Sequence, residues 1–246
     1  MILAVPAVPM KSGIPEQGRI RGEGERMALQ HLAGKIAQRE PSERRSRAGE
    51  IAIDERLVES DDVEELAAAA ERFTGAAAGA AARLAGERFT KFCFLGTGAL
   101  RAVAVESALK VLELTAGRVY TWSESYLGVR HGPLSAVDDE TLVLGFLSGD
   151  GRRRAYELDL LREVGAKGLA AKIVAVWPSE VPRDAGFDES LSLGLAAGFD
   201  DLHRPPLDVI FGQLFGLFNS LGQGLKPDTP SPKGAITRVV ERVRIH

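Results

Sequence analysis

Three charged residues, Glu106, Lys110 and Glu113, interrupt an otherwise apolar stretch of the sequence, AVESALKVLE. If this stretch is helical, spacings of four and seven residues place all three on one face, within about 40° of each other around the axis. A charge buried without a partner is costly, so such groups are usually paired or functional. Carboxylates in this position can take up and release protons. The alternative is an ordinary i,i+4 ion pair between Glu106 and Lys110, which is common on any helix.

A histidine, His131, stands in the segment RHGP, eighteen residues after Glu113. The unperturbed pKa of imidazole lies near neutrality, so this side chain suits proton transfer, although a single histidine before Gly-Pro is also typical of a turn. The four histidines are scattered along the sequence, and Cys93 is the single cysteine. We therefore expect no metal-ligand cluster and no internal disulfide.

The charged helix lies between two candidate strands. The apolar run Phe92–Leu95 ends at the turn Gly96-Thr97-Gly98, and a helical pattern follows over about 99–115, closed by Gly117. A second apolar run covers Arg118–Trp122. A strand, a glycine-rich turn, a helix and a strand in this order predict a βαβ unit of a parallel sheet.

The rest of the sequence continues the alternation of strands and helices. Ser123–Val137 reads as an irregular segment with a short helical turn. Continuous apolar runs of strand length predict buried parallel strands. The further candidate strands are 141–147, 172–177 and 190–195, and the further candidate helices are 152–165 and 207–225. This pattern predicts an α/β fold, a doubly wound parallel sheet sandwich. Ligands of such sheets bind at the carboxyl ends of strands, where the turns at 96–98 and 148–151 both fall.

Composition limits the class of protein. The chain has 246 residues, 45% of them hydrophobic and 26% charged, which is ordinary for a soluble globular protein. A net charge of −3 gives no electrostatic argument for a nucleic-acid partner. Its N-terminal sequence is a poor signal peptide, and no run of 18 apolar residues indicates a membrane span. We expect a soluble, cytoplasmic protein.

The amino-acid composition divides the chain into three parts. Residues 1–60 contain little with which to build a core, and we expect a poorly structured helical or irregular N-terminal extension. An alanine-rich stretch with an acidic start predicts a helix over 61–90, which leads into a core domain at 91–246.

The motifs together resemble the sugar isomerase (SIS) family. The turn GTG, the segment ESALKVLELTAG and the segment RHGPLSAVDDETLV carry the resemblance, which runs from about Phe92 to His246. Within the family, the chain is similar to the second SIS domain of the tagatose-6-phosphate ketose/aldose isomerases, also described as galactosamine-6-phosphate deaminase/isomerases. The resemblance implies a phosphosugar substrate and proton transfer between neighbouring carbons, with no cofactor.

The resemblance also implies roles for individual residues. Glu113 matches the glutamate that moves the proton between C1 and C2 of the open-chain sugar, and Glu106 and Lys110 match its two companions on the helix. His131 matches the histidine that assists ring opening, often across a subunit interface. Lys233 is a candidate by its position near the C-terminus; its alternative is a solvated tail residue. The turns implied in substrate binding contribute Gly96, Thr97, Gly98 and Ser148.

The sequence departs from two-domain members of the family in one respect. These have a first SIS domain with a serine-rich phosphate loop, and residues 1–90 are too short for such a domain. The matching loop here, 147–151, has one serine and Asp150, which would repel a phosphate, although Arg152–Arg154 could attract one. Three alternatives to a complete enzyme remain: a truncated product, a half-enzyme completed by another chain, and a non-catalytic module that binds phosphosugar. In each case we expect a homodimer or a higher homo-oligomer.

Overall fold

The computed structural model describes residues 60–183 and 185–228. They form a five-stranded sheet in the order β2-β1-β3-β4-β5, in which every neighbouring pair is parallel. The strands are β1 (Lys91–Leu95), β2 (Tyr120–Glu124), β3 (Thr141–Phe146), β4 (Lys172–Trp177) and β5 (Glu189–Ser192). The predicted α/β fold with a doubly wound parallel sheet is thereby confirmed. The expectations for residues 1–59 lie outside the described part of the chain.

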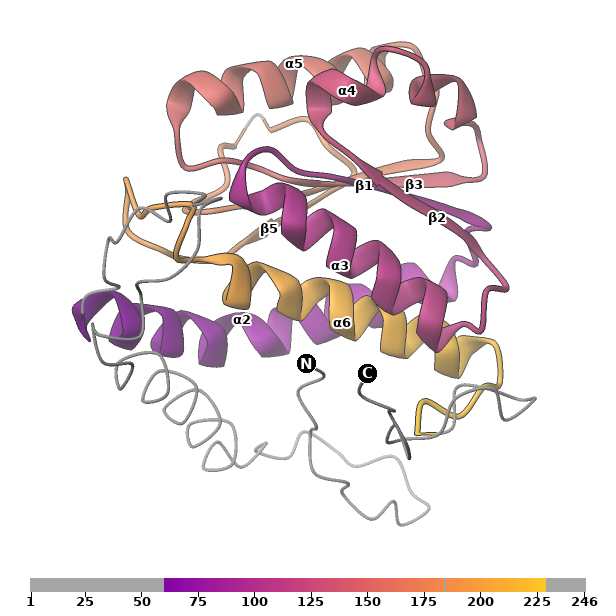
Figure 1. The fold of residues 1–246 in the computed structure, drawn as a ribbon, viewed down its shortest axis with the longest axis horizontal. Coiled ribbons are helices and arrows are strands. Elements are labelled where there is room, and N and C mark those ends of the chain that lie inside the picture. The colour runs from indigo at the N-terminus through magenta and orange to yellow at the C-terminus, as the bar shows by residue number, and fades with distance from the viewer. Residues whose placement is uncertain (1–59, 184, 229–246) are drawn as a thin grey trace, which may run out of the picture. The chain divides into compact units, whose positions relative to one another are not determined.

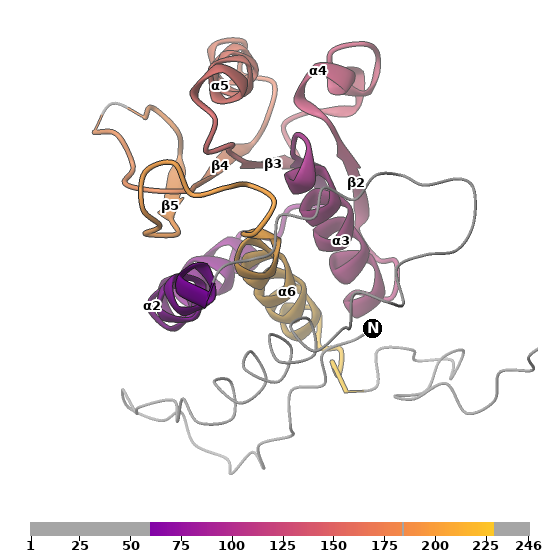
Figure 2. The same ribbon diagram turned by 60° about the vertical axis from the view of Figure 1, so that its left-hand side comes forward.

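Helices cover both faces of the sheet (Figure 1, Figure 2). One face carries α2 (Ser60–Gly86), α3 (Ala99–Leu114) and α6 (Pro205–Gly222), with α6 packed against both of the others. The opposite face carries α4 (Tyr126–Val129), the 3-10 helix η2 (Pro133–Ala136) and α5 (Gly151–Ala166). None of the helices in the described ranges combines the length and the hydropathy that crossing a membrane requires.

The predicted elements differ from the observed ones mainly at their ends. The second strand begins at Tyr120 rather than Arg118, because Ala116 and Gly117 both have positive φ angles and lengthen the turn after α3. The last helix begins at Pro205, ahead of its first predicted residue, because proline at the first helical position needs no backbone N–H donor. The last strand is shorter than expected and ends at Ser192.

Close contact between α3 and α6 depends on glycines in α6. A Cβ atom at Gly212 would lie 2.1 Å from Ser107 Oγ, and one at Gly216 would lie 3.2 Å from the backbone of Lys110. The distance at Gly212 is too short for any side chain, and the one at Gly216 leaves only a tight contact, so the two helices approach each other through glycine. Phe215, between these glycines, points into the core and packs edge-to-face on Phe92 of β1 at 4.9 Å.

Candidate functional site

The three charged residues of α3 lie together, as their spacing predicted. The ammonium group of Lys110 is 2.7 Å from Glu113 Oε2 and 3.4 Å from Glu106 Oε1. Lys110 is the most enclosed of the three, with 15% of its side chain exposed, whereas Glu113 is 38% exposed. The carboxylate of Glu113 is therefore neither sealed in the core nor free in solvent.

Packing against α6 fixes the position of Lys110, whose backbone abuts Gly216. Burial by itself would lower the pKa of this amine, but the hydrogen bond to Glu113 and the charges of both glutamates outweigh burial, so its pKa lies above the ordinary value. Lys110 is thus a cation at neutral pH. It can hold the Glu113 carboxylate in one orientation through a charge-assisted hydrogen bond.

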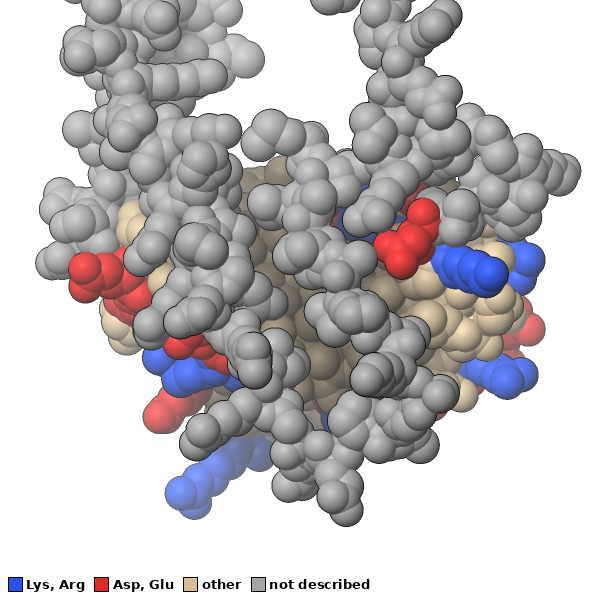
Figure 3. Space-filling view, turned by 90° about the horizontal axis from the view of Figure 1, so that it is seen from below, with Lys and Arg blue, Asp and Glu red and all other residues tan. Residues whose placement is uncertain are grey.

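An apolar strip flanks these charges on the outer surface of α3. Val105, Leu109 and Leu112 are 47%, 40% and 43% exposed, and each stands next to one of the charged residues in the sequence. In the view from below, the described surface visible near the centre is uncharged, and the Lys, Arg, Asp and Glu side chains gather toward the sides (Figure 3). The candidate acid–base group thus stands in apolar surroundings, which favour exclusion of water when another surface covers them.

His131 lies elsewhere. It is exposed in the turn between α4 and η2, where its backbone N–H donates to the Gly128 carbonyl oxygen at 3.0 Å. That turn belongs to the layer on the opposite face of the sheet from α3 (Figure 1). The fold therefore brings Glu106, Lys110 and Glu113 together and does not bring His131 to them within one chain. Lys233 lies outside the described residues.

The turns Gly96-Thr97-Gly98 and Ser148-Gly149 meet at the carboxyl edge of the sheet, as predicted. Helix α3 starts at this edge and runs away from it, so Glu113 is about 21 Å along the helix axis from Ala99. The side chain of Ser148 is fully buried, with its hydroxyl donating to Asp201 and its backbone N–H donating to Glu157 Oε2 at 2.7 Å. Glu113 is therefore at the opposite end of α3 from the turn Gly96-Thr97-Gly98, which was predicted to bind substrate.

Sequence reasoning missed a buried polar network at this edge. Arg204 is fully buried and pairs with Asp208 at 2.7 and 2.8 Å and with Asp201 at 3.2 Å. Burial raises the pKa of Asp208, and it also raises that of Glu157 against the lowering effect of the Ser148 N–H. The spacing of Arg204 and Asp208, four residues at the start of a helix, was the available signal.

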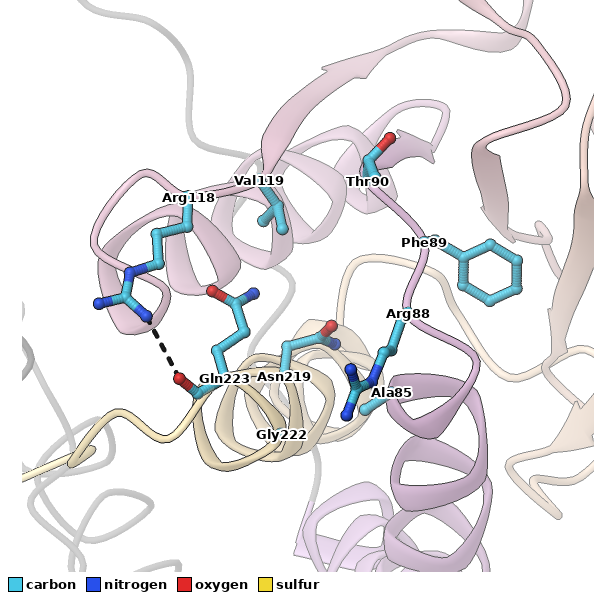
Figure 4. Close-up of a pocket in the computed structure, with 9 residues that line it drawn as sticks. All are labelled: Ala85, Arg88, Phe89, Thr90, Arg118, Val119, Asn219, Gly222 and Gln223. Atoms are coloured by element: carbon cyan, nitrogen blue, oxygen red, sulfur yellow. Dashed lines mark hydrogen bonds between the residues drawn. The ribbon is translucent and has the colours of Figure 1, made fainter.

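A hollow of about 440 Å³ lies at the other end of the sheet. It is formed by the C-terminal ends of α2 and α6 and by the segments that lead into β1 and β2 (Figure 4). Arg118 donates to the Gln223 carbonyl oxygen at its rim, at 3.2 Å. None of the residues predicted from the sequence lines it. The described residues also contain no group of three or more His, Cys, Asp or Glu side chains arranged to hold a metal ion.

Known proteins resemble this chain strongly. No family model matches it. A D-galactosamine-6-phosphate deaminase, AgaS, of Escherichia coli is 41% identical over 156 residues, which are 63% of this chain and 40% of the relative. A glutamine–fructose-6-phosphate aminotransferase of Methanothermobacter thermautotrophicus is 31% identical over 147 residues, which are 56% of this chain and 22% of that enzyme.

Solved structures agree with these relatives. The tagatose-6-phosphate ketose/aldose isomerase of Escherichia coli superposes with a TM-score of 0.62 at 34% identity, over 70% of this chain and 47% of that one. The resemblance to SIS domains of this group is thereby confirmed. The chain spans less than half the length of the deaminase and the isomerase that it matches.

Proposed function

We propose that this chain carries the proton-transfer residues of a sugar-phosphate isomerase, and that the reaction converts an amino-sugar phosphate such as galactosamine 6-phosphate to tagatose 6-phosphate and ammonia. The observation that supports this most is Glu113: a half-exposed carboxylate, held at 2.7 Å by a lysine, in an apolar surface. The deaminase and isomerase names of relatives that are 41% and 34% identical supply the substrate class.

In this proposal Glu113 acts as base and then as acid. Its carboxylate takes the C2 proton of the open-chain amino aldose, and the resulting enol-amine receives a proton from Glu113 at C1. The product is a ketimine at C2, which water hydrolyses to the ketose and ammonia. Lys110 keeps the carboxylate oriented throughout. The steps require no cofactor and no metal.

The proposed role of His131, ring opening, needs a second chain. His131 and Glu113 are on opposite layers of one subunit, so a site that contains both must combine Glu113 of one chain with His131 of another. Oligomers with two-fold symmetry place residues of two subunits in each of two equivalent sites. We therefore propose that the active form is a homodimer or a higher homo-oligomer.

A second candidate is a non-catalytic module, or a half-enzyme that another chain completes. The engagement of the Ser148 hydroxyl and of the Gly149 N–H with Asp201 favours it, because these groups are not available to grip a phosphate. Under this alternative the chain binds sugar phosphate without converting it, or it is active only in a complex with a second chain that supplies the phosphate-binding residues.

One assay separates the two candidates. The purified chain is incubated with galactosamine 6-phosphate, and ammonia and tagatose 6-phosphate are measured over time. Equal amounts of the two products, lost in a Glu113→Gln variant that still folds, support the enzyme. Calorimetric binding of galactosamine 6-phosphate without release of ammonia supports the binding module, and the absence of both binding and turnover supports the half-enzyme.

A further inference from the structure

A hollow at the amino edge of the sheet is lined by two arginines. It has a volume of about 440 Å³ and lies where α2 and α6 end and where the chain enters β1 and β2. Figure 4 shows Arg118 on one side, Arg88 on the other, and the side chains of Asn219 and Gln223 between them. None of the described residues that line it is acidic. A space of this size is typical of sites for small molecules.

Arg88 has a backbone conformation that favours glycine. Its φ angle is 59°, in the left-handed region, and its N–H donates to the Ala85 carbonyl oxygen at 3.4 Å, where α2 ends. Helices commonly end with such a residue, which is usually glycine because a Cβ atom makes this conformation costly. Strained residues of this kind cluster at ligand sites, so an arginine at this position indicates a use for its side chain.

The charge of Arg88 is available to a ligand. The C-terminal ends of helices carry partial negative charge, which favours cations at this hollow. Arg118 compensates that charge at the end of α6, because it donates to the Gln223 carbonyl oxygen at 3.2 Å. The Arg88 guanidinium, in contrast, makes no hydrogen bond or ion pair with any residue in the described ranges. The carboxylate of the preceding residue, Glu87, pairs with Lys172 instead.

Neutral polar groups form the wall between the arginines. Asn219 is 4% exposed, and its Nδ2 donates to the Phe215 carbonyl oxygen at 2.8 Å, which leaves Oδ1 as an acceptor. Gln223 adds a second amide, which can donate and accept. The Phe89 ring points away from the hollow and packs edge-to-face on Phe92 at 6.5 Å, so it offers no surface for stacking (Figure 4). The hollow therefore fits the hydroxyl groups of a sugar better than a nucleobase.

We propose that this hollow is a second binding site, for a sugar phosphate whose phosphate group lies between Arg88 and Arg118. The sugar hydroxyls contact the amides of Asn219 and Gln223. Guanidinium groups bind phosphate oxygens through charge-assisted hydrogen bonds, and a tetrahedral phosphate can accept them from two sides. Glu113 does not line the hollow, so this site exists whether or not the chain transfers protons.

Removal of either arginine tests the site. Binding of glucose 6-phosphate, adenosine 5′-monophosphate, inorganic phosphate and glucose is measured by calorimetry. Arg88→Gly removes the cation at a position where glycine is unstrained, so this variant should melt no lower than the native chain. Arg118→Gln removes the second cation. Arg162→Ala, at an exposed residue of α5, is the control for the loss of one positive charge.

We expect the native chain to bind glucose 6-phosphate, and Arg88→Gly and Arg118→Gln to bind it at least about tenfold more weakly, as the loss of a hydrogen bond to a charged group predicts. Arg162→Ala should bind it as the native chain does. Glucose, which has no phosphate, and adenosine 5′-monophosphate, whose base finds no stacking surface, should bind more weakly than glucose 6-phosphate. Arg88→Asn is the second variant, because asparagine also tolerates a positive φ angle, and it should behave as Arg88→Gly does.

Three results would overturn the proposal. The first is a native chain that binds none of the phosphate compounds at millimolar concentrations. The second is a folded Arg88→Gly or Arg88→Asn that binds glucose 6-phosphate as tightly as the native chain. The third is tighter binding of adenosine 5′-monophosphate than of glucose 6-phosphate. Binding lost in Glu113→Gln but kept in Arg88→Gly would place the sugar phosphate at Glu113, which is the second result in another form.

Discussion

Glu113 is held in place by its neighbours on α3. The sequence spacing predicted that Glu106, Lys110 and Glu113 share a face, and periodicity alone is enough for that conclusion. It did not predict that Lys110 would lie closer to the glutamate three residues ahead, at 2.7 Å, than to the one four residues behind, at 3.4 Å. That preference depends on side-chain conformations, which are set where Lys110 packs against α6.

Lys110 should therefore act through Glu113. We expect Lys110→Met to lower kcat by about 10- to 100-fold, because the carboxylate loses the cation that orients it. Glu106→Gln is the matched control; its weaker contact with Lys110 predicts a smaller loss. Steady-state ammonia release from galactosamine 6-phosphate measures both. If Lys110→Met retained full kcat, Glu113 would not need this partner.

Glu157 should affect stability without being exposed to substrate. Because burial raises its pKa in the folded state, folding favours the protonated form. Protonated Glu157 therefore contributes to the free energy of unfolding. This contribution is complete below the pKa of glutamate in the unfolded chain, about 4.3, and is lost as the pH rises through the pKa of Glu157 in the folded chain. Because glutamine stays neutral, we expect the Glu157→Gln variant to be more stable than the native chain at pH 7. Its free energy of unfolding should also vary less with pH above about pH 4.3. Urea unfolding at a series of pH values checks this; a Glu157→Gln variant less stable at pH 7 would show that the ionised form is favoured.

At the scale of elements, apolar runs identified the strands and 3.6-residue periodicity identified α3 and α5. The predicted β4 agrees with the observed Lys172–Trp177 to the residue, because a fully buried parallel strand is a continuous apolar run. The segment that carries Asp201 and Arg204 was not predictable in this way. Asp201 belongs to no regular element, and its partners Ser148 and Gly149 lie some 50 residues away in the sequence.

The contact between α3 and α6 predicts a large effect for a small substitution. Gly212→Ala should cost about 1–3 kcal/mol of unfolding free energy, because the added methyl group would collide with Ser107 and push the helices apart. Gly75→Ala in α2, where a Cβ meets nothing within 4 Å, is the control and should stabilise the chain by up to about 1 kcal/mol. Chemical denaturation measures both. Equal effects would show that the helices do not meet through Gly212.

At the scale of the whole molecule, the layered sheet separates the two predicted proton-transfer groups. Right-handed connections place α3 on one face of the sheet and the α4 segment on the other, so Glu113 and His131 are on opposite sides of β1 and β2. The sequence could suggest both residues but not this separation, since it follows from topology and not from either motif. The resemblance to known SIS domains had already implied a histidine that acts across subunits.

Mixing of inactive subunits tests whether the site is shared. If His131 of one chain serves Glu113 of another in a dimer, Glu113→Gln and His131→Asn chains refolded together should regain about a quarter of native activity, because half of the dimers are mixed and each has one intact site. Each variant refolded alone is the control. Mixtures as inactive as the separate variants would place both groups in the same chain's site, or would remove His131 from it.

The most direct test of the central claim follows the proton itself. The native chain is incubated with tagatose 6-phosphate in D₂O, and deuterium incorporation at C1 is followed by NMR. We expect incorporation by the native chain and a rate at least about 100-fold lower in Glu113→Gln, in keeping with the usual contribution of a general base. Equal incorporation by both proteins, or none by the native chain, would contradict the assignment of proton transfer to Glu113.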